Sequence, residues 1–327
     1  MALRLGLIVC LTVAACGSDA PADDDDDEAV PDAAAADADP NAPDAPPGEG
    51  VPVLEGMWGG RGTAPGQFIE PSSVELDSDG IVIVAGHEDR VQRFTQDGDL
   101  IDIFGSPGSG DGEFNHPHGL AVDRLRGDLI YVGDQENSRL QVFSKEGAFV
   151  RQWGDPQFAH IHDVGIDPST GDIFVGDYEL DTLRKFSSTG ELLASYGGTG
   201  AGPGQFNGVW GVSTDSDGNV YVADTFNRRV QKLDRDGAFL AEWTDYDGTP
   251  FQKPTGVFVD TNDVIHVCDS LAETVSLFDV DGGALAQWNL AAIIGTRTEP
   301  EDIVLSPDGA HIYIAEVFEH RVYHLVR

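Results

Sequence analysis

Residues 217–231 read DGNVYVADTFNRRVQ, and this stretch decides the fold. It opens with the hairpin-turn pair Asp217-Gly218, after which a short run of β-branched and aromatic residues ends at Asp224. A second run of the same kind begins at Arg229. Short apolar runs bounded by turn residues are typical of antiparallel strands, so the stretch predicts two strands joined by a tight turn.

The same pattern recurs six times along the chain at intervals of 43–48 residues. The equivalent runs end at Gly86, Asp134, Asp177, Asp224, Asp269 and Glu316. Each run follows a strand opened by a Pro-x-Gly-like segment and precedes a third strand, and in five of the repeats a turn glycine and a fourth strand ending in an aromatic residue then follow. Four short antiparallel strands per repeat describe one blade of a β-propeller. The sequence therefore predicts an all-β, six-bladed propeller.

The N-terminal strand is expected to close this ring. The sixth repeat stops at Arg327 after three strands, and its fourth strand is supplied by residues 53–58, which end in Trp58. Pairing the two chain ends in the last blade removes exposed sheet edges. We therefore expect residues 51–327 to form one closed domain, which we expect to be monomeric.

The six repeats resemble NHL repeats, and the resemblance runs from about residue 53 to residue 327. It implies a six-bladed propeller. It does not imply an activity, because NHL-repeat proteins include scaffolds, RNA binders, protein-binding modules and a few enzymes.

The first 16 residues read MALRLGLIVCLTVAAC and have the form of a secretory leader. Residues 13–16, VAAC, resemble the lipobox of bacterial lipoproteins. The resemblance implies removal of residues 1–15 and a diacylglycerol on Cys16, whereas the alternative is an ordinary signal peptide with an incidental cysteine. Gly17 after the cysteine favours the outer membrane. We expect a lipid-anchored protein of the bacterial cell envelope that faces the periplasm or the surface.

Charge is strongly and unevenly negative. The chain has 57 acidic and 19 basic residues, a formal charge of −38, and residues 17–50 hold 12 acids and no base. This Ala/Asp/Pro-rich segment cannot bury a core, so residues 16–50 are expected to form a disordered tether behind the lipidated cysteine. Residues 51–327 carry 45 acids and 18 bases, a formal charge of −27. That charge disfavours nucleic acid and favours cationic partners.

One residue of each Pro-x-Gly-like segment is expected at the mouth of the central channel. These residues begin the innermost strands, on the same face as the acids that end the second strands. Ligands of propellers usually bind at this mouth. The candidate ligand-binding residues are Ser72, His118, His162, Trp210, Thr255 and Glu301.

Histidines are concentrated in two equivalent segments, His116-Pro117-His118 and His160-Ile161-His162, on neighbouring blades. In an extended segment, residues two apart point the same way, so each pair could direct two imidazoles at one site. Imidazoles with an added carboxylate suit zinc or another divalent metal, and His87 and Glu301 are further candidate ligands. The alternative is a set of polar histidines that line a solvated funnel.

Residues 117–120, PHGL, also resemble the zinc-ligand segments of peptidylglycine-amidating lyases, which are six-bladed. That family takes three histidines from alternate blades, whereas here the two histidines lie on adjacent blades, and Gln135 stands where that family has an arginine. Two functions follow. The first is a non-catalytic module that binds a protein, peptide or glycan through its top face. The alternative is a metal-dependent hydrolase or lyase that uses the histidine cluster.

Overall fold

The computed structural model describes residues 50–154 and 158–327. The expected signal peptide and the tether up to residue 49 lie outside the described residues. Within the part that is described, no helix is long and apolar enough to cross a membrane.

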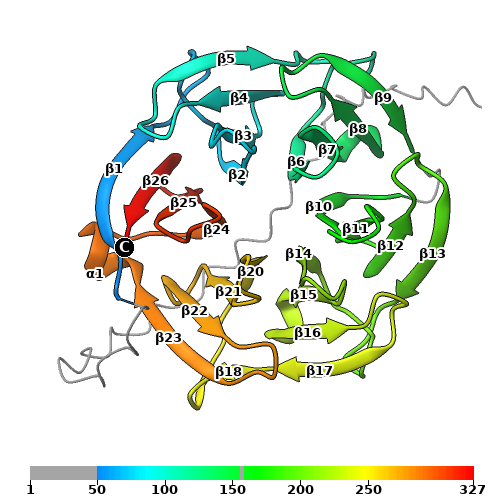
Figure 1. Ribbon diagram of the computed structural model, residues 1–327, viewed down its shortest axis with the longest axis vertical. Helices are drawn as coiled ribbons and strands as arrows, with labels where there is room; N and C mark the ends of the chain where they lie inside the picture. The colour runs from blue at the N-terminus through cyan, green and yellow to red at the C-terminus, as the bar shows by residue number, and fades with distance from the viewer. Residues whose placement is uncertain (1–49, 155–157) are drawn as a thin grey trace, which may run out of the picture. The chain divides into compact units, whose positions relative to one another are not determined.

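Six four-stranded antiparallel sheets stand around a central channel, so the predicted all-β, six-bladed propeller is confirmed (Figure 1). In five of these sheets the strands run from the channel outward in chain order, and in the sixth the outermost strand is the N-terminal one. The first three blades are β2 (Pro71–Leu76), β3 (Val82–Gly86), β4 (Arg90–Phe94) and β5 (Leu100–Phe104); β6 (Pro117–Asp123), β7 (Leu129–Asp134), β8 (Arg139–Phe143) and β9 (Phe149–Trp153); and β10 (Ile161–Ile166), β11 (Ile173–Asp177), β12 (Thr182–Phe186) and β13 (Leu192–Gly197).

The remaining blades follow the same order. They are β14 (Val209–Thr214), β15 (Val220–Asp224), β16 (Arg229–Leu233) and β17 (Phe239–Trp243); β20 (Pro254–Val259), β21 (Ile265–Asp269), β22 (Thr274–Phe278) and β23 (Ala284–Asn289); and β24 (Pro300–Leu305), β25 (His311–Glu316) and β26 (Arg321–Val326), completed by β1 (Val53–Gly59). The minor elements are the hairpin β18 (Asp245–Tyr246) and β19 (Thr249–Pro250), the helix α1 (Leu290–Ile294), and the 3-10 turns η1 (Gln135–Asn137) and η2 (Thr225–Asn227).

The N-terminal strand closes the ring as predicted. Strand β1 pairs antiparallel with β26, with Val53 opposite Val326 and Trp58 opposite Val322. The Trp58 ring lies 5.7 Å from Phe94 and 6.0 Å from Tyr313, measured between ring centroids. Trp58 therefore joins the last blade to the first.

The hydrophobic core lies between neighbouring blades. Four of the six second strands are buried along their whole length, and the exceptions are the partly exposed first residues Leu129 of β7 and His311 of β25. Outer strands alternate exposed and partly buried residues, as in β9 and β17. Each cluster mixes two blades: Ile83 and Val91 of the first blade pack with Leu120 and Ile130 of the second. Burial on both faces explains why the inner strands are almost continuously apolar.

A glycine and an aromatic ring meet at five of the six blade interfaces. The turn glycine before each outer strand has a positive φ and lies against the aromatic ring that ends the outer strand of the preceding blade. The pairs are Gly98–Trp58, Gly147–Phe104, Gly190–Trp153, Gly237–Tyr196 and Gly282–Trp243. A Cβ on any of these glycines would lie 1.6–2.7 Å from a ring atom. At the sixth interface, where the chain ends take the place of this turn, the Arg327 guanidinium lies 4.7 Å from the Trp288 ring.

Candidate functional site

The acids that end the second strands hold the top-face loops in place. Asp224 is fully buried and accepts hydrogen bonds from the Asn207 amide (2.7 Å), Arg229 Nε (2.7 Å) and Gln231 Nε2 (2.9 Å). The Asn227 side chain donates to the same carboxylate at 3.0 Å. Asp134 has the same four kinds of partner in the second blade. These carboxylates are saturated with donors, so they organise the loops and are not free to bind a ligand.

The first blade reaches the same arrangement with a different residue. Gly86 replaces the acid, but the Glu88 carboxylate accepts from the Ile69 amide at 3.0 Å and from Gln92 Nε2 at 3.1 Å. A Cβ at Gly86 would lie 2.8 Å from Glu88 Oε2. The missing side chain thus makes room for a carboxylate that arrives from two residues further along the chain.

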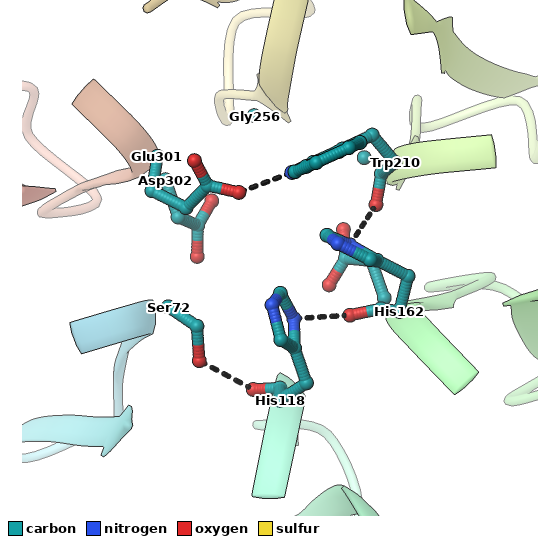
Figure 2. Close-up of a pocket in the computed structure, with 9 residues that line it drawn as sticks. Ser72, His118, His162, Trp210, Gly256, Glu301 and Asp302 are labelled. Carbon is teal, nitrogen blue, oxygen red and sulfur yellow. Dashed lines mark hydrogen bonds between the residues drawn. The ribbon is translucent and has the colours of Figure 1, made fainter. Parts of the chain in front are cut away.

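Five of the six predicted mouth residues line one small pocket at the channel (Figure 2). The pocket has a volume of about 10 Å³, room for about one water molecule, and its lining includes Ser72, His118, His162, Trp210 and Glu301. Thr255 is the exception, because its hydroxyl is buried and donates to the Pro300 carbonyl of the next blade at 2.8 Å. The two histidines and Glu301 are also buried, so they do not line a wide solvated funnel.

Both pocket histidines are oriented by the backbone of the next blade. His118 Nδ1 lies 2.9 Å from the His162 carbonyl oxygen, and His162 Nδ1 lies 3.0 Å from the Trp210 carbonyl oxygen. A carbonyl oxygen only accepts, so each Nδ1 carries the proton of a neutral imidazole. Each Nε2 is then left as a lone-pair donor, and the two rings lie 3.8 Å apart between centroids.

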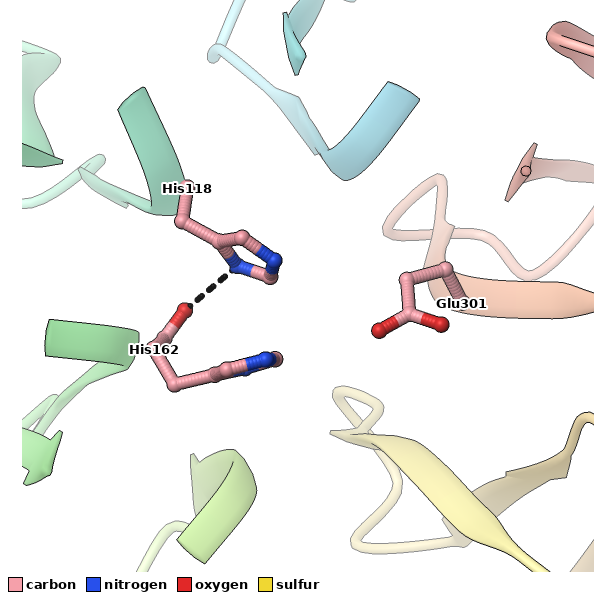
Figure 3. A group of neighbouring side chains, drawn as sticks. All are labelled: His118, His162 and Glu301. Atoms are coloured by element: carbon pink, nitrogen blue, oxygen red, sulfur yellow. Dashed lines mark hydrogen bonds between the residues drawn. The ribbon is translucent and has the colours of Figure 1, made fainter. Parts of the chain in front are cut away.

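Glu301 faces the two imidazoles from the opposite side of the channel (Figure 3). Trp210 Nε1 donates to Glu301 Oε1, and the Trp210 ring lies 4.3 Å from the His162 ring. The Lys253 ammonium also contacts Trp210 and lies 4.7 Å from the centre of its ring. One ligating atom each from His118, His162 and Glu301 lies within 4.8 Å of the other two.

The other candidate histidines lie outside this group. His116 has a φ of +63°, so its segment is not extended there, and its ring lies 3.6 Å from that of His87. His87 Nδ1 is 3.1 Å from a Glu70 carboxylate oxygen. His160 Nε2 lies 3.5 Å from Glu136. The expectation that each His-x-His pair shares one site is therefore not met by the backbone at His116, and metal binding by any of these residues stays a prediction.

The NHL repeat family matches residues 114–143 and 206–233. These segments belong to the second and fourth blades, where the buried aspartate, asparagine, arginine and glutamine form the full network described above. Two of the six blades thus carry NHL repeats.

Relatives include the two groups expected from the sequence. NHL repeat-containing protein 3 of Homo sapiens is 29% identical over 195 residues, which cover 53% of this chain and 54% of the relative. Peptidyl-glycine alpha-amidating monooxygenase A of Xenopus laevis is 28% identical over 149 residues, 41% of this chain and 16% of the relative. The match thus spans about half of the first relative and less than a fifth of the second.

A solved virginiamycin B lyase from Staphylococcus aureus, in complex with Quinupristin, has the same fold. The TM-score is 0.59 at 13% identity, and the alignment covers 80% of this chain and 82% of that one. At this identity the likeness concerns the fold alone.

Burial controls the protonation of the pocket residues. It lowers the pKa of His162 to about 3 and the pKa of His118 well below its usual value. Both imidazoles are therefore neutral near pH 7. Burial raises the pKa of Glu301 to about 7, against the opposing effects of Lys253 and the Trp210 hydrogen bond.

Two further carboxylates, Asp163 and Asp302, line the pocket and were missed in the sequence. Asp163 accepts from the Val212 amide at 2.7 Å, and Asp302 accepts from the Val74 amide and the Ser73 hydroxyl, both at 2.9 Å. Each bridges to the next blade. The signal was present: these acids follow the mouth residue where three other blades have Gly119, Gly211 and Gly256.

The rim of the top face has an apolar half beside two exposed acids. The residue two positions after the strand-end acid is apolar in three consecutive blades, at Phe226, Leu271 and Phe318, with exposures of 50%, 46% and 45%. In the other three blades this residue is a glutamate: Glu136 and Glu179 are exposed, whereas the Glu88 side chain is buried in the loop network described above. The Phe226 ring contacts the rings of Tyr178 and Trp210, at centroid distances of 5.9 Å and 6.3 Å, and Trp210 in turn lines the pocket.

Proposed function

We propose that this NHL propeller is a binding module whose top face holds a protein or peptide carrying both apolar and basic side chains. The observation that carries the proposal is the apolar half-rim of Phe226, Leu271 and Phe318, exposed at equivalent positions in three neighbouring blades. Exposed apolar groups that gather on one face mark interaction sites. NHL-repeat propellers commonly bind proteins, which agrees with this reading.

Charge complementarity identifies the chemistry of the partner. The half-rim adjoins blades that present Glu136 and Glu179, and residues 51–327 have a formal charge of −27. A partner with lysine or arginine beside its apolar side chains would be attracted to this face, while polyanions would be repelled. A protein or peptide fits both features better than a glycan, which has neither cationic groups nor large apolar ones.

A displayed library of random peptides tests the proposal. Peptides selected on the wild-type chain should be enriched in aromatic and basic residues, and Phe226→Ser with Phe318→Ser should weaken their binding at least tenfold. Leu125→Ser is the matched control, because Leu125 is 70% exposed in the turn between β6 and β7, at the opposite end of the blade. Selected peptides that bind the double variant as tightly as the wild type would refute top-face binding.

The propeller is further proposed to be held at the outer membrane of the cell envelope by a lipid on Cys16. The support is the leader and the VAAC segment at residues 13–16. Cys16→Ser should move the protein out of the membrane fraction and abolish the lipid mass on the mature N-terminus. A wild-type N-terminus without lipid mass would overturn this part of the proposal.

The buried group of His118, His162 and Glu301 favours a second candidate function, a metal-dependent hydrolase or lyase. Two neutral imidazoles and a carboxylate are the ligands of many catalytic metal sites. The virginiamycin B lyase with the same fold shows that such a ring can carry an enzyme. Metal-dependent turnover of a lyase or esterase substrate, lost on treatment with chelator, would support this function over simple binding.

A further inference from the structure

We propose that the propeller binds one divalent transition-metal ion, zinc or an ion of the same ligand preference, through His118 Nε2, His162 Nε2 and a Glu301 oxygen (Figure 3). The inference goes beyond the proposed binding module, because the rim uses different residues, and the second candidate function depends on it. It carries four independent lines of support.

The first is the orientation of the imidazoles. Each Nδ1 donates to a backbone carbonyl of the next blade, at 2.9 Å for His118 and 3.0 Å for His162. Metal-ligating histidines almost always use the second nitrogen in this way, because the hydrogen bond fixes the ring and its tautomer. In the described part of the chain, neither Nε2 has a hydrogen-bond partner, although both side chains are more than nine-tenths buried.

The second is the support of the carboxylate. Trp210 Nε1 donates to Glu301 Oε1, which leaves Oε2 free to bind a cation. Ligating carboxylates are themselves usually held by a hydrogen bond of this kind. The three ligands thus come from three blades; the next blade positions each histidine, and Trp210 of the fourth blade positions Glu301 of the sixth.

The third is the charge around the pocket. Glu301, Asp163 and Asp302 all line it, and the nearby Lys253 ammonium is directed at the Trp210 ring, 4.7 Å from its centre. A divalent cation would offset this cluster of carboxyl groups. The two nitrogen ligands select zinc and its neighbours over magnesium and calcium, which prefer oxygen ligands only.

The fourth is the size of the site. The ligating atoms lie within 4.8 Å of one another, whereas ligand atoms in a tetrahedral zinc site are about 3.3 Å apart. Since 4.8 Å is the upper limit for any pair, no two ligating atoms have to approach by more than about 1.5 Å. Three protein ligands leave a fourth position, which opens on the pocket and would take water or an oxygen atom of a ligand in the channel.

Equilibrium dialysis of the full chain against zinc, followed by elemental analysis, tests the proposal. The chain should be purified in detergent, and free zinc should be buffered in the micromolar range. We expect one zinc per chain for the wild type and at least 100-fold weaker binding for His118→Ala with His162→Ala. Glu301→Gln should weaken binding at least tenfold, and Trp210→Phe about 10–100-fold, because it removes only the support of the carboxylate.

Two other histidine pairs serve as matched controls. His311 Nδ1 lies 2.9 Å from His324 Nε2, and His87 and His116 are in ring contact beside Glu70. Replacing either pair with alanine should leave the zinc affinity within about twofold of the wild type.

Unfolding temperatures separate loss of a ligand from loss of the fold, and Glu301→Gln provides a test if the double histidine variant unfolds. No zinc uptake by the wild type, or uptake that survives in Glu301→Gln and moves with a control pair, would overturn the proposal. Such a failure would also remove the second candidate function, but selected peptides would still bind the rim.

Discussion

Gly237→Ala tests whether the glycine–aromatic contacts fasten neighbouring blades together. Gly237 has a φ of +82°, and a Cβ there would lie 2.0 Å from the Tyr196 ring of the preceding blade. Gly248 has the same φ of +82° in the β18–β19 hairpin, with nothing within 4 Å of the added atom. The two substitutions therefore share the backbone cost and differ only in the clash.

The magnitudes follow from these two terms. Placing alanine at positive φ costs about 1–2 kcal/mol, and forcing an extra carbon into a packed interface costs about 1–3 kcal/mol more. We expect Gly248→Ala to lower the free energy of unfolding by about 1–2 kcal/mol and Gly237→Ala to lower it by about 2–5 kcal/mol. Urea unfolding followed by tryptophan fluorescence measures both. Adding Tyr196→Ala should recover part of the loss at Gly237, since it removes the ring that the new methyl group meets. Equal losses for the two glycine variants would refute the interblade contact.

Three further predictions concern closure, the buried acids and pH. Deleting residues 17–50 should barely change the melting temperature, whereas extending the deletion to residue 59 removes β1 and should lower it and raise light scattering; equal melting of the two chains would contradict closure by β1. Asp224→Ala should lower the free energy of unfolding by about 3–5 kcal/mol because it removes the Nε partner of the buried Arg229, whereas Glu242→Ala, which removes a half-exposed partner of the same arginine, should lower it by no more than about 1 kcal/mol. A larger loss for Glu242→Ala than for Asp224→Ala would disprove the anchoring role. Burial lowers the pKa of His266, so as the pH falls below about 6.5 the unfolded state takes up a proton before the folded state does. The free energy of unfolding of the wild type should therefore fall by up to about 1.4 kcal/mol per pH unit relative to His266→Gln, and parallel stability curves between pH 4.5 and 6.5 would rule this out.

The fold could be predicted because local sequence patterns determine each blade and recur along the chain. The turn glycines, the terminal aromatics and the strand-end acids each follow from requirements within a few residues, so they recur with the blade. The relation between the glycine of one blade and the ring of the preceding blade was not visible, because the sequence shows recurrence but not which copies touch. Glu88 taking the place of an acid at Gly86 is a similar exchange that only the packed loop shows.

The candidate site could be predicted in part for the same reason. The mouth position followed from strand direction, and five of its six residues line one pocket. The side-chain directions did not follow, because they depend on the positive φ of His116 and on which carbonyl each Nδ1 meets in the next blade. Asp163 and Asp302 occupy a position that is glycine in three other blades, so comparison of the repeats at that position would have found them.

Anomalous diffraction is the most direct test of the claim that the top of the central channel is a metal site. Crystals of the full chain grown with zinc should be measured on both sides of the zinc absorption edge. We predict one strong anomalous peak per chain, bounded by His118 Nε2, His162 Nε2 and a Glu301 oxygen. An empty channel, with peaks only at exposed carboxylates or at His311 and His324, would contradict it.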